Sequence, residues 1–494
     1  MLYGPDVTVV DTNGWDGDNI QAAIDSALGS GRACVVYVPA GDWTLKDSLR
    51  LYSQASPGIQ PAVRLVGAKP AYPQQGGGHT RLVCNFPFKD RPAIDIQATR
   101  ASTVENLVLQ GQNNFLFSLE GAADDAMWLG SGVTEDHVAI AIDRSPGHGS
   151  SGVLIDNVSA KFFAGGISIG ASGHGGTLNS ENHTVRRFCG HFLGKAGLIL
   201  GQHQSKGVKI QDSYFFGQQY WIDCARYGLK KGYPPVVSGC NVGGTQRLFN
   251  LVHSIGTFAC HGLFVESTLS LGTVGWGASS MNVPAVFTGC HFNLWMPAGK
   301  NPDTHLFCFQ PTLFQGCTFQ ISWDTSLTTQ AAFRIFNGQE AVFDTCVFLP
   351  DAKNGRLPVD FDQPGLAELR RCRYRDSGQG SLTVHGQAVM ETVDLGSAMV
   401  AVSGPGRATF TLPNGAPDLE PGDLVGRTGV GTAWLPKAHV ANPLVYRTVL
   451  SFGIVNQVSQ GVVTLHQVPE TVEKELAASP GTPWALQRRR TAAA

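Results

Sequence analysis

The sequence predicts an all-β solenoid, in which each coil of the chain stacks on the one before it, from three observations. A short motif recurs between about residues 104 and 374, at intervals of about 26 residues. Within each copy, apolar and polar residues alternate, which is the period of a β-strand and not of a helix. The chain also has 60 glycines and 27 prolines, which favour tight turns between short strands.

The recurring motif has an apolar start, a turn residue and then an inward residue. Its copies read VENLVL, LIDNVSA, VRRFCG, IQDSYF, VSGCNV, FVESTL, FTGCHF, FQGCTF, FDTCVF and LRRCRY. The predicted inward residues are Leu107, Val158, Phe188, Ser213, Cys240, Ser267, Cys290, Cys317, Cys346 and Cys372. The steps between them are 51, 30, 25, 27, 27, 23, 27, 29 and 26 residues, as in a solenoid with one repeat per coil. The step of 51 contains either an inserted loop or an unrecognised coil.

Five of the predicted inward residues are cysteines, one in each coil. The sequence has no C-x-x-C pair, and its eleven cysteines are an odd number, which does not suit a disulfide framework. We therefore predict an interior stack of small apolar side chains, rather than a metal site, at Cys240, Cys290, Cys317, Cys346 and Cys372.

The N-terminal stretch predicts a helix followed by a strand. Residues 18–28 place apolar residues on one helical face, with Asp18 as the N-cap and Gln21 completing a capping box. The strand CVVYVPAGDW follows and is stopped by Pro39. This pair closely resembles the start of pectate-lyase-like right-handed parallel β-helix proteins, in which the helix covers the open end of the first coil.

The resemblance implies a right-handed parallel β-helix of about ten or more coils. Proteins of this fold include pectate and other polysaccharide lyases, glycoside hydrolases, sugar transferases, epimerases and phage tailspikes, so the fold does not select one reaction. We expect an N-terminal cap over residues 1–48 and the β-helix over 49–380. A small C-terminal β unit over 381–470 is expected to follow, because the repeat stops at about residue 381. The last expected part is a loose tail over 471–494, with docking through Trp484 as an alternative.

Composition limits the partners. The net charge is -2 and only 15% of residues are charged, so nothing indicates nucleic acid. No run of 18 apolar residues predicts a membrane-spanning helix. The start MLYGPDVTVVDTNGWDG does not resemble an export signal, so the protein either stays in the cell, leaves as part of a phage particle, or has lost a leader.

Loops between residues 171 and 261 carry the main functional signal. From Ala164 onward each coil has a second strand, and the loops after these strands are rich in polar residues. We expect one side of consecutive coils to present His174, Glu181, His183, His203, Lys206, Asp223, Arg226, Tyr227, Lys230, Lys231, Tyr233 and His253. The segment between Leu109 and Val153 is a second candidate, either a groove wall or an irregular coil with a surface loop.

Residues 186–247 contain nine basic side chains against Asp212 and Asp223. This excess predicts a positive band, which is either a solvated face or a groove for an acidic polysaccharide. Aromatic residues in the same coils are natural platforms for sugar rings. The expected substrate-binding residues are His174, Lys206, Trp221, Tyr233, Arg247, His253 and Trp276.

Two kinds of chemistry fit these residues. Asp212 and Glu266, predicted two coils or about 10 Å apart, suit the acid and base of an inverting glycosidase, unless Asp212 only caps its turn. Elimination from a uronate requires a cation on the carboxylate and a base for the adjacent proton. The candidate catalytic residues are Asp223, Arg226, Tyr227, Lys230, His203, Asp212 and Glu266.

Three classes of function remain open. The first is an enzyme that cleaves a polysaccharide, with a lyase slightly favoured over a hydrolase. The second is a non-catalytic tailspike or adhesin, and the third is a sugar transferase or isomerase. We expect no cofactor; Ca²⁺ is an alternative, although the chain lacks the acidic cluster of calcium-dependent pectate lyases. The resemblance also implies a homotrimer as one assembly state.

Overall fold

The structure is a computed structural model that divides into two compact units, Met1–Gln310 with Cys317–Ser322 and Pro311–Gly316 with Trp323–Ala494. Within them it describes residues 6–55, 58–70, 78–115, 128–144, 149–170, 180–201, 206–224, 233–251, 257–268, 270–274, 285–296, 306–308, 312–323, 333–335, 340–349, 361–362, 366–370, 372–375, 381–383, 387–388, 390–416, 418–421, 424–427, 451–466, 468, 470–478 and 480–491.

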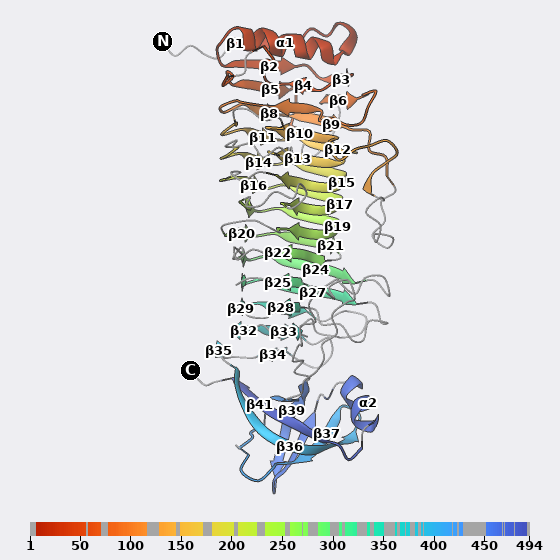
Figure 1. Cartoon of the computed structure of the whole chain (residues 1–494), viewed down its shortest axis with the longest axis vertical. Coiled ribbons are helices and arrows are strands. Elements are labelled where there is room, and N and C mark those ends of the chain that lie inside the picture. The colour runs from red at the N-terminus through yellow and green to blue at the C-terminus, as the bar shows by residue number, and fades with distance from the viewer. Residues whose placement is uncertain are drawn as a thin grey trace. The chain divides into compact units, whose positions relative to one another are not determined.

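The first unit is a right-handed parallel β-helix, as the sequence predicts (Figure 1). Each coil contributes strands to three faces in turn, which we call face A, face B and face C. Face A consists of β1 (Asp6–Val9), β2 (Cys34–Val38), β5 (Val63–Gly67), β8 (Thr103–Glu105), β11 (Leu154–Asp156), β14 (Thr184–Arg186), β16 (Lys209–Gln211), β18 (Val236–Ser238), β20 (Phe258–His261) and β23 (Ala285–Thr288).

Faces B and C merge into one sheet because three long strands bend around the corner between them. These strands are β15 (Cys189–Leu200), β17 (Tyr214–Asp223) and β19 (Asn241–Asn250). Face B is formed by their first halves with β3 (Gly41–Leu45), β6 (Thr80–Cys84), β9 (Leu107–Gln110), β12 (Ser159–Lys161), β21 (Phe264–Thr268), β24 (His291–Met296) and β27 (Thr318–Trp323). Face C is formed by their second halves with β4 (Leu49–Arg50), β7 (Ile94–Ile96), β10 (Val138–Ile142), β13 (Gly165–Ile169), β22 (Ser270–Val274) and β25 (Leu306–Cys308).

The turn from face A to face B is one residue with positive φ in successive coils. The residues are Asn106, Asn157, Arg187, Asp212, Gly239, Gly262 and Gly289, with φ between 49° and 62°. Asparagine and glycine accept this conformation at the lowest cost. The expected copy at Ser267 is therefore wrong by four residues, because the turn is at Gly262 and the inward residue is Leu263. Alternation with a period of two does not distinguish registers that differ by an even number.

The step of 51 residues is one coil that carries an insertion. β8 pairs directly with β11, so no coil lies between them on face A. On face C, β7 pairs directly with β10. The extra residues lie between β9 and β10, where the sequence analysis expected either a groove wall or an irregular coil.

The predicted cysteine stack is confirmed. In the first unit, Cys240, Cys290 and Cys317 are at most 2% exposed. The Cys317 thiol donates to the carbonyl of Phe287 at 3.4 Å. Burial raises the pKa of the Cys240 thiol to about 12. These thiols therefore serve as small core side chains.

Helix α1 (Gly17–Gly29) follows the 3-10 turn η1 (Asn13–Trp15) and caps the first coils. Its buried face contains Ile20, Ile24, Ala27 and Leu28, as predicted. The N-cap is Asp16 and not Asp18, because the Asp16 carboxylate accepts the amide of Asp18 at 3.2 Å. Gln21, expected in the capping box, instead holds the helix to β4, accepting from the Arg50 amide at 2.8 Å.

The second unit begins with further solenoid strands. β26 (Thr312–Gln315), β29 (Glu340–Asp344) and β32 (Leu366–Arg370) are parallel, as are β28 (Phe333–Ile335) with β31 (Phe361–Asp362) and β30 (Val347–Leu349) with β33 (Arg373–Arg375). Cys346 and Cys372 are buried here and donate to the carbonyls of Phe314 and Phe343. β34 (Ser381–Thr383) and β35 (Gln387–Ala388) then add in the antiparallel direction.

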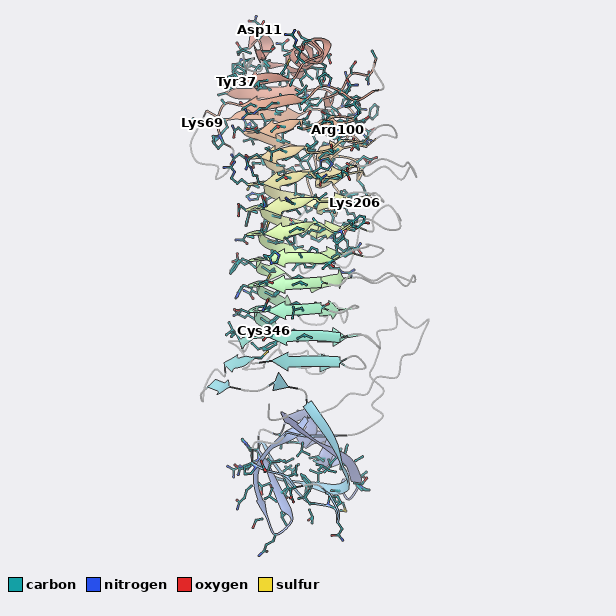
Figure 2. All side chains as sticks on the ribbon, turned by 90° about the vertical axis from the view of Figure 1, so that its left-hand side faces the viewer. Asp11, Tyr37, Lys69, Arg100, Lys206 and Cys346 are labelled. Carbon is teal, nitrogen blue, oxygen red and sulfur yellow. The ribbon has the colours of Figure 1, made fainter. Side chains whose placement is uncertain are left out.

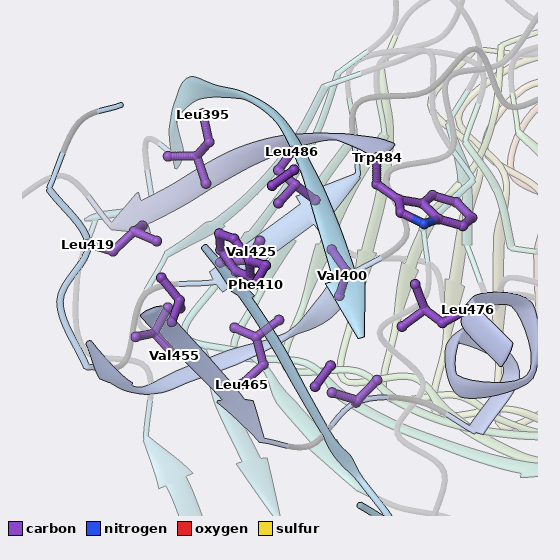
Figure 3. Close-up of a cluster of buried hydrophobic side chains, with 14 residues drawn as sticks. Leu395, Val400, Phe410, Leu419, Val425, Val455, Leu465, Leu476, Trp484 and Leu486 are labelled. Carbon is purple, nitrogen blue, oxygen red and sulfur yellow. The ribbon is translucent and has the colours of Figure 1, made fainter. Parts of the chain in front are cut away.

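The second unit ends in a small closed β-barrel around an apolar core (Figure 3). Its elements are β36 (Met390–Gly404), β37 (Arg407–Thr411), β38 (Leu424–Arg427), β39 (Ser451–Ser459), β40 (Val462–His466), α2 (Glu470–Ala478) and β41 (Pro483–Thr491). The expectation of a loose tail is wrong: β41 pairs with β36 and β38, and Trp484 and Leu486 are buried. Alternating apolar residues in PWALQ were the overlooked strand signal. Neither helix among the residues described is long and apolar enough to span a bilayer.

Candidate active site

A polar cleft of about 250 Å³ lies at the N-terminal end of face C. It is built by three adjacent strands, because β7 pairs with β4 on one side and with β10 on the other. Residues before, within and after these strands supply its lining, which consists of Asp47, Ser48, Arg50, Tyr52, Gln54, Asp90, Arg91, Asp95 and Arg144. The cleft therefore contains three carboxyl groups, three guanidinium groups and a phenol.

Asp95 is the buried acid of the cleft. It points outward from β7 but is only 7% exposed. The Tyr52 hydroxyl donates to Asp95 Oδ2 at 3.3 Å, and Gln97 Nε2 lies 3.3 Å from both carboxyl oxygens. Burial raises the pKa of Asp95 to about 6, even though these hydrogen bonds and Arg144 favour the charged form. A carboxyl group in this state can donate a proton near neutral pH.

Asp47 is the ionised carboxylate of the cleft. Arg91 Nη1 donates to Asp47 Oδ1 at 2.9 Å, and Arg50 Nη1 is 3.8 Å from Asp47 Oδ2. Burial acts to raise the pKa of Asp47, but the bonds from Arg91 and the Ser48 amide outweigh it and hold the pKa below its ordinary value. Asp95 thus keeps its proton to a higher pH than Asp47 within one cleft, and carboxyl groups whose pKa values are pushed apart are the usual arrangement of an acid and base pair.

His137 holds the segment that contains Arg91 and leads into β7. Its Nδ1–H donates to the Arg91 carbonyl at 3.1 Å, while its Nε2 accepts the Gln112 amide at 3.0 Å. Burial lowers the pKa of His137 to about 4, so the ring is neutral at physiological pH. The insertion predicted as a groove wall is thereby tied to the cleft.

Asp143 locks the corner that follows β10. Its carboxylate accepts the amide and the hydroxyl of Ser150, both at 2.7 Å, and the amide of Ala98 at 3.3 Å. His183, expected in a surface loop, is fully buried and lies 3.0 Å from the Ser180 hydroxyl. Because these groups are all enclosed, we assign them a structural role.

Asp223, a predicted catalytic residue, lies in the same outward row of face C as Asp95. The strand register places Asp223 four coils beyond Asp95, or about 19 Å at the inter-strand spacing. Asp223 is 5% exposed and accepts Asn250 Nδ2 at 3.0 Å. The row consists of Arg50, Asp95, Ala141, Ser168, Ile199, Asp223 and Asn250.

In two places a cationic side chain lies over an aromatic ring in a pair that includes a residue predicted by the sequence analysis to bind substrate. On face C, Arg247 Nη1 donates to the Tyr220 hydroxyl at 3.3 Å, and the Arg247 guanidinium lies 6.0 Å from the Tyr220 ring centre. Lys206, at an edge of the solenoid in Figure 2, lies 5.3 Å from the Tyr233 ring centre. The first pair contains one predicted binding residue, Arg247, and the second contains two, Lys206 and Tyr233.

Several predictions are wrong in the structure. Trp221 is fully buried between Phe215 and Phe249, so it is a core residue and not a sugar platform. Asp212 is exposed in the turn from face A to face B, whereas Glu266 lies on face B, in the column of Phe216 and Gly243. The two carboxylates therefore do not form a catalytic pair, because the misplaced repeat copy had put both at turns.

The predicted positive band carries less net charge than the count of basic residues suggested. Arg186 and Arg187 both bind Asp156, at 2.7 and 2.5 Å, and Asp156 lies outside the stretch in which charges were counted. Arg186 belongs to face A, whereas Arg247 belongs to face C. The basic residues are consequently divided between faces. The remaining predicted residues, His174, His203, Arg226, Tyr227, Lys230, His253 and Trp276, lie outside the described residues.

The sequence analysis overlooked the cleft around Asp95. A signal was present, because aspartate and arginine lie together in or beside the face C strand of three successive coils, in DSLR, DRPAID and AIDR. The step of 51 residues hid this alignment. Within the described ranges, no group of three or more His, Cys, Asp or Glu side chains is arranged to hold a metal ion.

No protein-family model and no curated protein matches the chain. Among solved structures, ORF18 of Geobacillus virus E2 is 13% identical, with a TM-score of 0.43 over 94% of this chain and 78% of its own. DFA-IIIase from Arthrobacter chlorophenolicus A6, in a form without its lid, is 13% identical, with a TM-score of 0.44 over 75% and 94%. The catalytic domain of a GH87 alpha-1,3-glucanase, in complex with tetrasaccharides, is 12% identical, with a TM-score of 0.37 over 70% and 65%. These likenesses are too weak to transfer an activity.

Proposed function

We propose that the protein binds a polysaccharide on face C and hydrolyses a glycosidic bond at the cleft. The observation that carries this proposal is a pair of carboxyl groups in one cleft, the buried Asp95 and the arginine-paired Asp47, whose environments move their pKa values in opposite directions. Hydrolysis needs a proton donor and a proton acceptor at once, because the leaving oxygen must gain a proton while water must lose one.

In the proposed reaction, Asp95 gives its proton to the glycosidic oxygen as the bond to the anomeric carbon breaks. Water adds to that carbon, and Asp47 accepts the proton that the water loses. Tyr52 and Gln97 hold the Asp95 carboxyl in place, and Arg91 keeps Asp47 charged. Farther along the same sheet, the outward row of face C holds the polar side chains of Asp223 and Asn250, which are hydrogen-bonded to each other.

The test uses a panel of neutral and acidic polysaccharides, with release of reducing ends as the signal. We expect Asp95→Asn and Asp47→Asn each to lower the rate at least about a hundredfold, since each removes one proton transfer. The matched control is Asp42→Asn, which changes an exposed, arginine-paired aspartate on face B. Full activity of both cleft variants would refute the assignment of the cleft.

A second candidate is β-elimination from a uronate, which the Arg247 and Tyr220 pair favours. The guanidinium beside the phenol can neutralise a substrate carboxylate and stabilise a tyrosinate base. Elimination produces an unsaturated sugar that absorbs in the ultraviolet, whereas hydrolysis does not. Ultraviolet-absorbing product that is lost in Tyr220→Phe but kept in Asp95→Asn would establish the lyase.

A further inference from the structure

Face B has an outer surface that the proposed reaction does not use. Two rows of outward side chains cross its coils, as the strand register shows. The first row is Tyr214, Asn241, Phe264 and His291. The second row is Lys161, His191, Phe216, Gly243 and Glu266. Solvent-facing strand positions are usually polar, so three aromatic rings and two imidazoles on neighbouring coils are unusual.

The rings on face B contact one another across coils. Phe264 and His291 are stacked, with ring centres 4.8 Å apart and planes 9° from parallel. His191 meets the edge of Tyr214 at 5.3 Å. Phe264 is 44% exposed, whereas the other rings are partly buried. The surface therefore presents ring faces and edges in fixed positions.

Gly243 takes the place of a side chain in the second row. It is buried, and a side chain there would begin only 3.1 Å from Phe216 Cδ2, so the glycine leaves room for the Phe216 ring. Asn241 lies two residues before Gly243 on β19, and Phe264 follows Asn241 in the first row. Aromatic rings, an amide and a carboxylate therefore lie on neighbouring positions of face B.

We propose that face B carries a second, non-catalytic binding surface for a glycan chain, centred on the exposed ring of Phe264. A sugar ring has an apolar face of C–H groups and a rim of hydroxyls. Its face can stack on Phe264 and Phe216, and its hydroxyls can bind Glu266 and the imidazole of His191. Burial lowers the pKa of His191 and of His291, so both rings are neutral and can donate and accept hydrogen bonds.

The same side chains disfavour a second copy of this chain as the occupant. A stable protein interface needs a continuous apolar core, whereas Phe264 is exposed and the rings around it are partly buried. A glycan needs separate ring faces beside polar groups, which is what face B offers. The strands β15, β17 and β19 continue from this surface onto face C, so a bound chain is held on the same strands as the row containing Asp223.

The experiment measures binding apart from turnover, in a protein that carries Asp95→Asn and Asp47→Asn. Polygalacturonate and dextran, cast separately into native gels, are the acidic and neutral probes. We expect at least one of them to retard this protein. Adding Phe264→Ala is expected to weaken the retardation about tenfold, the value of one lost aromatic contact. Gly243→Val forces the Phe216 ring to move without removing a ring, and it should weaken the retardation similarly.

The control is Val236→Ala, which trims a 42% exposed side chain on face A and should bind as before. Unchanged binding in both Phe264→Ala and Gly243→Val would overturn the proposal, as would the absence of retardation by either glycan. Sedimentation that changes from oligomer to monomer in Phe264→Ala would assign face B to self-association instead. Failure of the cleft would appear separately, as hydrolysis that survives Asp95→Asn.

Discussion

Burial sets the protonation state of Asp95, and the same burial costs folding free energy. The pKa of this carboxyl is about 6 in the folded protein, against an ordinary value of 3.8. Between these values the folded chain binds more protons than the unfolded chain, so stability falls as pH rises. Above about pH 6 the full penalty applies, which is about 3 kcal/mol at about 1.36 kcal/mol for each pKa unit.

The variant Asp95→Asn should therefore stabilise the protein at neutral pH, by up to about 3 kcal/mol, while having little effect below the ordinary pKa of aspartate. Urea unfolding across this pH range measures the difference, and it needs no substrate. A gain that is equal at all pH values would show that the pKa of Asp95 is not raised.

In each coil, the turn from face A to face B is followed directly by one inward residue, and the two form a repeated structural unit. The inward position accepts Leu107, Val158, Phe188, Ser213 or cysteine, so size is flexible while polarity is restricted. Ser213 shows how a hydroxyl is tolerated, since its Oγ donates to the Gln211 carbonyl at 2.7 Å. The cysteines place their thiols against backbone carbonyls in a similar way.

Cys317→Ser is consequently expected to cost no more than about 1 kcal/mol, because the hydroxyl can replace the thiol as a donor. Cys317→Asp should prevent folding or cost several kcal/mol, because it buries a charge without a partner. Thermal unfolding followed by circular dichroism compares the two. Equal loss in both variants would mean that the column does not discriminate by polarity.

The period of the motif was enough to predict the fold and the cysteine stack, because strand alternation and a fixed step are properties of the chain itself. The outward rows were harder to predict. Each row depends on register across coils. The insertion between β9 and β10 separated Asp143 from Asp47 and Asp95 in the sequence view, and the copy misplaced by four residues put Glu266 at a turn. Asp223 was found because its loop was rich in polar residues, whereas Trp221 was misjudged because alternation leaves the inward phase undetermined.

At the scale of the whole molecule, the C-terminal barrel depends on a strand from the far end of the chain. β41 lies between β36 and β38 and contributes Trp484 and Leu486 to the core. A chain that ends at Val468 should lose the barrel while keeping the solenoid of the first unit. Trypsin is expected to cut such a chain rapidly between residues 390 and 466. The control ends at Thr491 and should resist, and equal resistance of both chains would contradict the role of β41.

A parallel stack whose coils repeat one cross-section has the architecture of an amyloid fibril, in which any open edge recruits the next copy. The first unit closes one edge with α1, a helix that offers no strand ladder. The solenoid strands of the second unit end in β34 and β35, whose reversed direction breaks the parallel register. The repeat itself sets no limit to the number of coils. The length of the stack is therefore set by the elements at its ends, which stop further strands from adding in register.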